Sequence, residues 1–373
     1  MNNKKPCLAL LMPGFYEQIV GGSEYQSYLL AEYAIASGMD VHYIFIDQGG
    51  PFENRLGIEL HPLNKNPFPK TFGSTIFLYA RQIIRLLRSI QPTIVYVKGG
   101  YSWAGIATYF ARRNRCKSIL HIGSEKDIIH SPMYSMLTKP FDILNQKMIE
   151  FAIHHSMTVI TQAKYQVELL QKYYDRNSEV ILQMQPEPEE PLDKGKPLTI
   201  VWVANIKPLK QPNMFIQLAR ELQYYENVRF VMIGRPSSDK YQHKLDSEIQ
   251  ALKNLEYIGE QTIDRVNEIL SKYHIFVNTS TYEGFPNTFV QAWMRKVPVV
   301  SMLVDPDDIL KTRKIGYFSG SFEQMVKDVR GLIENATLRY DMGKRAREYA
   351  LENHSLKKNM KQLLNLMYPK EEL

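Results

Sequence analysis

The sequence predicts an α/β protein with two domains, each built on a parallel β-sheet covered by helices. Two observations predict this class. Short apolar runs alternate with helical stretches, and this alternation occurs on both sides of a Pro-rich acidic segment, Gln185 to Pro197. The 373 residues suffice for two or three domains with large cores. We expect an N-terminal domain at 1–185, a linker at 186–197, a C-terminal domain at 198–355 and a final helix at 356–373.

The first domain begins with a predicted strand at 7–12 and a loop that leads into a helix at 23–37, which ends before Gly38. Ser23 is expected to cap this helix, with Gln26 completing a capping box. The further strands are expected at 41–46, 93–98, 118–122, 157–161 and 180–182, and the further helices at 75–90, 102–113, 141–155 and 163–174. Ligands are expected at the carboxyl ends of such strands.

The second domain repeats this alternation. Its strands are expected at 198–204, 228–233, 275–277 and 297–301. Its helices are expected at 211–223, 241–253, 262–272, 287–295, 338–350 and 355–367. Two similar α/β domains joined by a linker predict a ligand site in the cleft between them.

Composition narrows the class of partner. The hydrophobic content of 44% and charged content of 23% are ordinary for a globular protein, and the net charge of +7 favours phosphates, an anionic membrane surface or nucleic acid. Nucleic acid is disfavoured, because the basic residues belong to no recognisable binding module. Cys7 and Cys116 are far apart, which argues against a disulfide scaffold and for a reducing compartment. No apolar run has the length of a signal peptide or membrane span, so we expect a cytoplasmic protein.

The stretch at 275–301 is the strongest candidate for a binding site. It has the pattern strand, turn, helix, strand, with the turn at Gly284-Phe285-Pro286-Asn287 and Asn287 as the expected N-cap. Backbone amides at a helix N-terminus beside a parallel strand form an anion site. Glu283 lies on the turn, and Gln291 lies about one helical turn inside.

Two further stretches lie at strand ends of the first domain. Gly21-Gly22 before the first helix allows close backbone approach to a ligand, and Glu24 follows. The spacing differs from G-x-G-x-x-G, which argues against a dinucleotide dehydrogenase. His121 ends a predicted strand at the ligand side. Two interpretations of His121 remain: a residue that faces the cleft, or a satisfied histidine at a strand end.

These stretches resemble the motifs of the retaining glycosyltransferases of family four. The stretch at 283–292 is similar to the signature E-G-F-x-N/L-x-x-x-E-A, with Glu283 at the first Glu and Gln291 in place of the second. Gly21, Gly22 and Glu24 match the loop G-G-x-E. The resemblance implies the GT-B fold, an α/β architecture of two Rossmann-like domains that face a central cleft, with the final helix crossing back to the first domain.

The resemblance also implies roles for individual residues. The segment 203–211 is similar to G-R-L-x-x-x-K-G, with Lys210 at the Lys and Asn205 in place of the Arg; Arg235 or Lys207 would restore the charge. Glu283, Lys210 and His121 are implied as catalytic, although His121 is one residue earlier than the family's His, and Glu24 lies on the acceptor side. The donor-binding residues implied are Gly21, Gly22, Asn205, Arg235, Gly284, Phe285, Pro286, Asn287 and Gln291.

The predicted function is that of a retaining hexosyltransferase. It moves a hexose-type sugar from a UDP- or GDP-sugar to a lipid-linked glycan or polysaccharide acceptor. Such chemistry depends on stabilising the departing diphosphate and positioning the acceptor, so we expect no metal ion and no other cofactor. The D-x-D at Asp305-Pro306-Asp307 is better interpreted as a helix start capped by Asp307 or Asp308. The alternatives are a nucleotide-sugar epimerase of the same fold and a nucleotide-sugar binding protein without catalysis.

The segment between Glu59 and Glu125 is basic, which bears on whether the protein contacts a membrane. Between Glu59 and Glu125 there is no acidic residue but ten Lys or Arg, and Arg81, Arg85 and Arg88 recur at helical spacing. One interpretation is a core-packed helix with a solvated basic face. The other is a surface that contacts anionic lipid or a lipid-diphosphate acceptor, as in a peripheral protein on the inner face of the plasma membrane.

Overall fold

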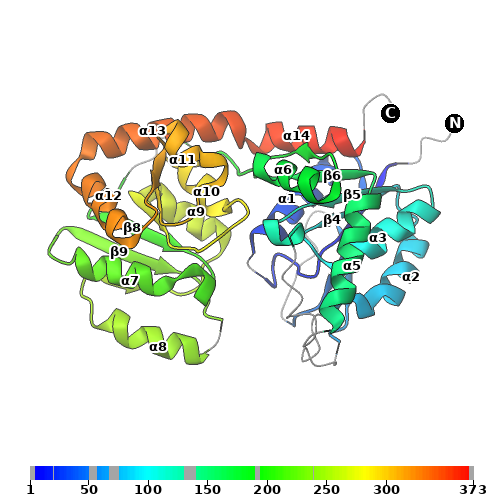
Figure 1. Ribbon diagram of the computed structural model, residues 1–373, viewed down its shortest axis with the longest axis horizontal. Helices are drawn as coiled ribbons and strands as arrows, with labels where there is room; N and C mark the ends of the chain where they lie inside the picture. The colour runs from blue at the N-terminus through cyan, green and yellow to red at the C-terminus, as the bar shows by residue number, and fades with distance from the viewer. Residues whose placement is uncertain are drawn as a thin grey trace. The chain divides into compact units, whose positions relative to one another are not determined.

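The computed structural model describes residues 5–19, 21–49, 57–66, 75–129, 140–189, 194–237 and 239–368. The chain divides into two compact units, one made of Met1–Gln183 with Lys357–Leu373 and the other of Met184–Leu356 (Figure 1). Residues 190–193 of the expected linker and residues 369–373 of the expected final helix lie outside the described residues.

The first unit is built on a parallel sheet with the strand order β3-β2-β1-β4-β5-β6-β7. The strands are β1 (Cys7–Leu11), β2 (Asp40–Ile46), β3 (Glu59–Leu63), β4 (Ile94–Lys98), β5 (Lys117–His121), β6 (Thr158–Thr161) and β7 (Glu179–Val180). The helices are α1 (Gly22–Ala36), α2 (Ala80–Ile90), α3 (Ser102–Arg113), α5 (Pro140–His155), α6 (Lys164–Tyr174) and α14 (Leu356–Met367), with 3-10 turns η2 (Ile76–Tyr79) and η3 (Glu125–Asp127). β1 pairs with both β2 and β4, so the strand order reverses there, as in a doubly wound fold.

One face of this sheet carries the apolar core of the unit. Ile44 of β2 and Val97 of β4 pack in a cluster with Leu87 of α2 and Trp103 of α3, all fully or almost fully buried. α3 and α5 approach closely, because a Cβ on Gly105 would lie 2.5 Å from the carbonyl oxygen of Met148. This packing holds the strand ends in fixed positions.

The second unit is built on a parallel sheet with the strand order β10-β9-β8-β11-β12-β13. The strands are β8 (Leu198–Val203), β9 (Val228–Ile233), β10 (Leu255–Tyr257), β11 (Ile275–Asn278), β12 (Val299–Ser301) and β13 (Gly316–Phe318). The helices are α7 (Pro212–Glu221), α8 (Asp239–Gln250), α9 (Ile263–Lys272), α10 (Asn287–Met294), α11 (Ile309–Arg313), α12 (Phe322–Glu334) and α13 (Ala336–Asn353), with 3-10 turns η4 (Pro208–Lys210) and η5 (Pro306–Asp308). β8 lies between β9 and β11, so the strand order reverses at β8 and β11. The prediction of two parallel-sheet α/β domains is confirmed.

The last helix belongs with the first unit. Met360, Leu363 and Met367 of α14 are buried, and the Asn359 side chain donates a hydrogen bond to the Leu182 carbonyl at 3.2 Å. Among the described residues, no helix combines the length and apolarity that crossing a bilayer requires.

Several local predictions are wrong. α1 begins at Gly22 with Gly21 as N-cap and no side-chain cap, so the Ser23 capping box does not form. The expected helix at 75–90 is a 3-10 turn followed by α2. The edge strand β3 was not predicted, since its sequence, ELHPL, contains a proline and little apolar alternation; proline is tolerated in a strand that lies at the edge of a sheet.

Candidate active site

The centre of the candidate site is an ion pair between two loops of the second unit. Lys210 ends the turn η4 that follows β8, and Glu283 lies on the loop that follows the neighbouring strand β11. The Lys210 Nζ lies 2.9 Å from the Glu283 Oε1, and each side chain is 16% exposed. The structure thus brings together the two residues of this unit that the sequence analysis singled out as catalytic.

The two loops are held to each other by hydrogen bonds. The Thr279 hydroxyl donates to the Lys210 carbonyl at 2.6 Å, and the Thr281 amide donates to the Leu209 carbonyl at 3.0 Å. The buried Trp202 indole N–H donates to the Thr279 hydroxyl at 2.9 Å. The backbone of Leu209 and Lys210 is therefore held to the loop that follows β11.

The Glu283 carboxylate is held as an anion. Its Oε1 accepts hydrogen bonds from the Asn278 side-chain amide at 2.9 Å and the Ser280 hydroxyl at 2.6 Å, in addition to the ammonium of Lys210. Burial by itself raises the pKa of Glu283, but the Lys210 charge and these hydrogen bonds lower it below its ordinary value. All three contacts go to Oε1, so within the described part of the chain Oε2 is the oxygen left for a ligand.

The turn after Glu283 presents the N-terminus of α10. Pro286 is the N-cap, in extended conformation, and no side chain caps the helix, so the expectation that Asn287 is the N-cap is wrong: Asn287 is the first helical residue. Phe285 is 4% exposed and packs against Trp293 and His354, so it anchors the turn rather than facing a ligand. Gly284 and Pro286 are also buried. The backbone of this turn is what can meet an anion.

Gln291 points into the second unit. It is 5% exposed, and its side-chain amide donates to the Asn267 side-chain oxygen of α9 at 3.0 Å. The amide nitrogen is therefore engaged inside the fold, and a contact with a ribose hydroxyl would have to use the side-chain oxygen.

Asn205 and Arg235 lie on adjoining segments at the carboxyl ends of β8 and β9. Asn205 is exposed, and the amide of the next residue, Ile206, donates to the Arg235 carbonyl at 2.8 Å. The segments approach so closely at Gly234 that a Cβ there would lie 1.8 Å from the Ala204 carbonyl oxygen. The Arg235 side chain is 50% exposed, with Nε 3.6 Å from a carboxylate oxygen of Glu260. The backbone of Arg235 thus lies close to the segment that carries Asn205, but the Arg235 guanidinium group faces Glu260.

In the first unit, Gly21 and Glu24 lie at the start of α1. The Glu24 carboxylate folds over Gly21 so closely that a Cβ on Gly21 would lie 2.1 Å from Oε2. Burial raises the pKa of Glu24, and its own backbone amide and the charge of Lys98 act in the opposite direction. The first glycine of the pair is needed to admit the Glu24 side chain, and Gly22 is the first residue of the helix.

Of the two interpretations of His121, the structure favours a buried histidine at a strand end over a residue that faces the cleft. His121 is 2% exposed at the end of β5, and its Nδ1 lies 2.6 Å from the Tyr96 hydroxyl. Burial, and then the neighbouring Lys98 charge, holds its pKa well below the usual range, so it is neutral. Its Nε2 is buried without a hydrogen-bond partner among the described residues. His121 is thus a buried histidine at the carboxyl end of β5, an inner strand of the sheet.

Lys98 is a residue that the sequence analysis missed. It ends β4 directly before Gly99-Gly100, is 2% exposed, and lies close enough to Glu24 and His121 to influence both. Burial lowers the pKa of Lys98 to about 7, with Glu24 acting in the opposite direction. The available signal was a lysine that directly follows the apolar run Ile94–Val97, since a buried lysine is rare unless it has a partner.

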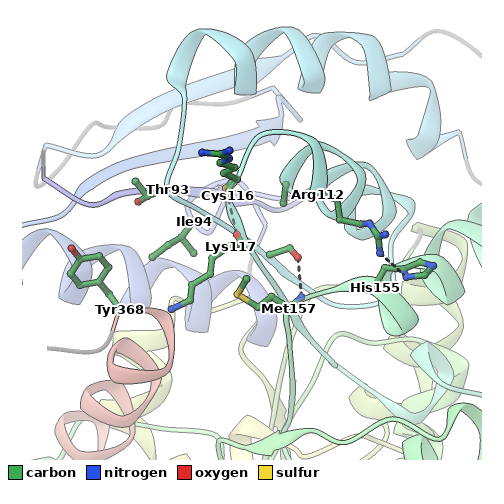
Figure 2. A pocket seen from close by; sticks show the side chains of 11 residues that line it. Thr93, Ile94, Arg112, Cys116, Lys117, His155, Met157 and Tyr368 are labelled. Carbon is green, nitrogen blue, oxygen red and sulfur yellow. Dashed lines mark hydrogen bonds between the residues drawn. The ribbon is translucent and has the colours of Figure 1, made fainter. Parts of the chain in front are cut away.

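Two other features lie outside this site. Asp308 is the N-cap residue of α11, as expected, but its side chain does not cap the helix. The side chain of Asp305 instead accepts hydrogen bonds from the backbone amides of Leu310 at 2.8 Å and Lys311 at 3.4 Å. A pocket of about 600 Å³ in the first unit is lined by the starts of β4 and β5 and by Arg112 and His155, as Figure 2 shows. These strand ends are opposite to the end that carries Lys98 and His121.

Both units of the chain match models of known protein families. The family model for glycosyl transferases group 1 matches residues 184–349, and the model for glycosyltransferase family 4 matches residues 20–182. The chain is 21% identical over 302 residues to the poly(ribitol-phosphate) alpha-N-acetylglucosaminyltransferase of Staphylococcus aureus, with 80% of this chain matched. It spans 59% of the length of that relative.

Solved structures share the fold of the chain. Sucrose-phosphate synthase from Thermosynechococcus elongatus has a TM-score of 0.77 at 13% identity, covering 97% of this chain and 98% of that chain. Anabaena HepE, solved with UDP and glucose, has a TM-score of 0.74 at 13% identity, covering 97% and 99%. With matches to family models over both units and with these folds, the chain belongs to the family-four glycosyltransferases of the GT-B fold.

Proposed function

We propose that this protein transfers a hexose-type sugar from a nucleotide-sugar to a glycan or lipid-linked acceptor, with retention of anomeric configuration. The observation that carries the proposal is the Lys210–Glu283 pair beside the N-terminus of α10. A cation and a helix N-terminus together stabilise a diphosphate that gains charge as the sugar departs. The carboxylate oxygen that remains on Glu283 can accept hydrogen bonds from sugar hydroxyls.

The donor is proposed to be a UDP- or GDP-sugar. Anabaena HepE, a structural relative, was solved with UDP and glucose, which favours UDP. We propose that Gln291 accepts from the ribose and that Asn205 and Arg235 lie along the diphosphate. We also propose that transfer needs no metal ion, because Lys210 supplies a fixed positive charge at the departing phosphate.

The acceptor is proposed to be a cell-surface polysaccharide or a lipid-linked precursor. The relative from Staphylococcus aureus is named for poly(ribitol-phosphate), a polyanion, and a net charge of +7 suits an acceptor that carries phosphate. We place the acceptor on the side of the first unit, beside Glu24 and the buried Lys98.

The proposed location of the protein is the cytoplasm, in association with the membrane. Arg81, Arg85 and Arg88 are all exposed on α2, whereas Ile83 and Leu87 are buried. A pocket of about 310 Å³ lies beside this helix. It is lined by Ala80, Ile84, Gly105, Ile106, Tyr109, Lys147, Met148 and Phe151. A basic face next to an apolar pocket fits the interface of an anionic bilayer.

The test is turnover of radiolabelled UDP- and GDP-hexoses with and without a lipid-linked or polyribitol-phosphate acceptor. A labelled glycan that forms only with acceptor supports the transferase. Conversion of the sugar without acceptor would instead indicate an epimerase of the same fold, and tight binding without conversion would indicate a protein that only binds nucleotide-sugars. Proton NMR of the new linkage tests retention, and an inverted anomeric signal would contradict it.

A further inference from the structure

A histidine pair at the edge of the first sheet forms a cluster to which the proposed function assigns no role. His42 lies on β2, and Glu59 and His61 lie on the edge strand β3. The His42 Nδ1 is 3.0 Å from the His61 Nε2. The Glu59 carboxylate places one oxygen 3.4 Å from His42 Nδ1 and the other 3.6 Å from His61 Nε2. With one atom from each residue, the three ligand-type atoms form a triangle whose members lie within 4.8 Å of one another.

We propose that this triangle is a zinc site, with His42 Nδ1, His61 Nε2 and a Glu59 carboxylate oxygen as protein ligands and water completing the coordination. Two imidazoles and one carboxylate form a ligand set that zinc prefers in proteins. Tetrahedral Zn²⁺, with ligand bonds near 2.0–2.2 Å, separates its ligand atoms by about 3.3–3.5 Å. The two ring nitrogens are 3.0 Å apart, and each lies 3.4 or 3.6 Å from a different oxygen of Glu59. A rotation of the exposed carboxylate that turns one oxygen toward both nitrogens would bring the three atoms to this spacing.

The scaffold holds these atoms in place. His42 is paired in register with Glu59, and Ile44 is paired with His61. Since alternate residues of a strand share a face, His42 lies on the same face as Ile44, and Glu59 and His61 lie on the same face as Leu63. Ile44 and Leu63 belong to the buried core of the unit. The cluster is therefore a polar continuation of a packed face.

Exposure of the three side chains also suits a metal centre. His42 and His61 are 14% and 16% exposed, whereas Glu59 is 65% exposed. The exposed carboxylate can shift to complete the site, and water can reach the fourth position.

Local sequence motifs could not reveal this site. The chain contains no H-E-x-x-H and no H-x-x-x-H, the local spacings by which a pair of zinc-binding histidines on one helix is recognised. The ligands come together only because β3 pairs with β2, and β3 itself was not predicted. They lie near the starts of β2 and β3, whereas Lys98 and His121 lie at the ends of their strands, so the zinc is proposed to secure an edge strand and to take no part in transfer.

The first experiment is calorimetric titration of Zn²⁺ into the full chain, freed of metal by a chelator and carrying no histidine tag. We expect one zinc per chain with a dissociation constant of about 10 µM or tighter. His42→Ala and His61→Ala should each weaken binding at least about tenfold, and Glu59→Gln should weaken it less. A variant with both His154→Ala and His155→Ala, whose rings are 6.3 Å apart on α5, is the matched control and should bind zinc as the unaltered chain does.

A second measurement does not depend on any variant folding. Co²⁺ bound to the unaltered chain should show the strong visible absorption of four-coordinate cobalt, and Zn²⁺ should displace it. A saturating excess of zinc should raise the melting temperature by about 5 °C, and folded His42→Ala should lack this rise. Absence of the cobalt bands at one equivalent would overturn the proposal. So would unchanged zinc affinity in folded His42→Ala and His61→Ala.

Discussion

The ammonium of Lys210 lies 2.9 Å from the Glu283 carboxylate although the two residues leave different strands of the second sheet. The hydrogen bond from the Thr279 hydroxyl to the Lys210 carbonyl holds the backbone that carries this lysine. A cation and an anion that are fixed in this way need little reorganisation when charge develops on a bound diphosphate. Loss of either partner should therefore affect the rate more than the fold.

We predict that Glu283→Gln lowers kcat at least about a hundredfold, because a neutral amide cannot hold Lys210 and accept from the sugar as the carboxylate does. The fold should survive, since Asn278 and Ser280 can still donate to the amide oxygen. Steady-state kinetics and circular dichroism check this. Glu268→Gln, which alters an exposed carboxylate of the same unit that pairs with Arg265 and Lys272, is the control and should retain most of the activity. Equal loss in both variants would argue against a special role for Glu283.

Gln291 offers a test of ribose binding. Gln291→Ala should raise the donor KM more than it lowers kcat, because a contact with the ribose contributes to donor binding, and Gln291→Glu should remain active. Gln291→Ala also leaves the Asn267 side chain without its donor. Asn267→Ala is therefore the control for packing, and it should destabilise the protein without the same change in KM. A Gln291→Ala enzyme with the kinetics of the unaltered protein would contradict the assignment.

The buried Lys98 predicts a particular dependence of stability on pH. Its pKa is about 7 in the folded state, whereas an unfolded lysine titrates near 10.5, so between these values the unfolded state binds one more proton. The free energy of unfolding should therefore rise with pH from 7 upwards by at most about 1.4 kcal/mol per unit, and Lys98 should give no slope below pH 7. Lys98→Met removes this titration and also the effect of the Lys98 charge on Glu24 and His121, so the slope between pH 7 and 9 is the quantity to compare.

Urea unfolding of both proteins at pH 6, 7, 8 and 9 is the measurement for Lys98. Lys98→Met should exceed the unaltered protein in stability by a constant amount up to pH 7, and the advantage should shrink above it. Parallel stability curves from pH 7 to 9 would show that Lys98 keeps an ordinary pKa in the fold.

The exposed arginines of α2 test membrane contact. Changing Arg81, Arg85 and Arg88 to Glu should release the protein from anionic vesicles, because each basic residue near such a surface contributes about 1 kcal/mol to binding. Sedimentation with vesicles that contain anionic lipid measures this. Changing the exposed Lys357, Lys358 and Lys361 of α14 to Glu alters the net charge equally and is the control. Equal release by both triple variants would indicate attraction by net charge alone, and unchanged sedimentation of the α2 variant would indicate a solvated helix face.

The sequence was sufficient for most of the fold because apolar runs such as Ile94–Val97 and Val228–Ile233 mark buried parallel strands locally. The edge strand β3 escaped prediction, since Glu59, His61 and Pro62 share no apolar pattern and the strand forms only through its pairing with β2. Caps were also poorly predicted. Gly21 and Pro286 start their helices through backbone conformation, which a search for capping side chains cannot detect.

The candidate site was predictable where a motif fixes both residue type and loop, as for Lys210 and Glu283. The direction of a side chain was not predictable at His121, because its burial depends on Tyr96 and Lys98 of the neighbouring strand. The same limit applies to Gln291, whose partner Asn267 lies on another helix. Contacts between elements decide these orientations, and no local pattern encodes them.

The most direct measurement is the turnover number of Lys210→Ala with its best nucleotide-sugar and acceptor. One fixed donor at a developing charge contributes roughly 3–4 kcal/mol, so we predict a fall in kcat of about a hundred- to a thousandfold with only modestly weaker nucleoside diphosphate binding. Lys253→Ala, at an exposed lysine of the same unit that has no assigned role, should stay within about twofold of the unaltered rate. Near-normal turnover of Lys210→Ala, with activity abolished by Arg235→Ala, would contradict this role and place the diphosphate nearer Gly234.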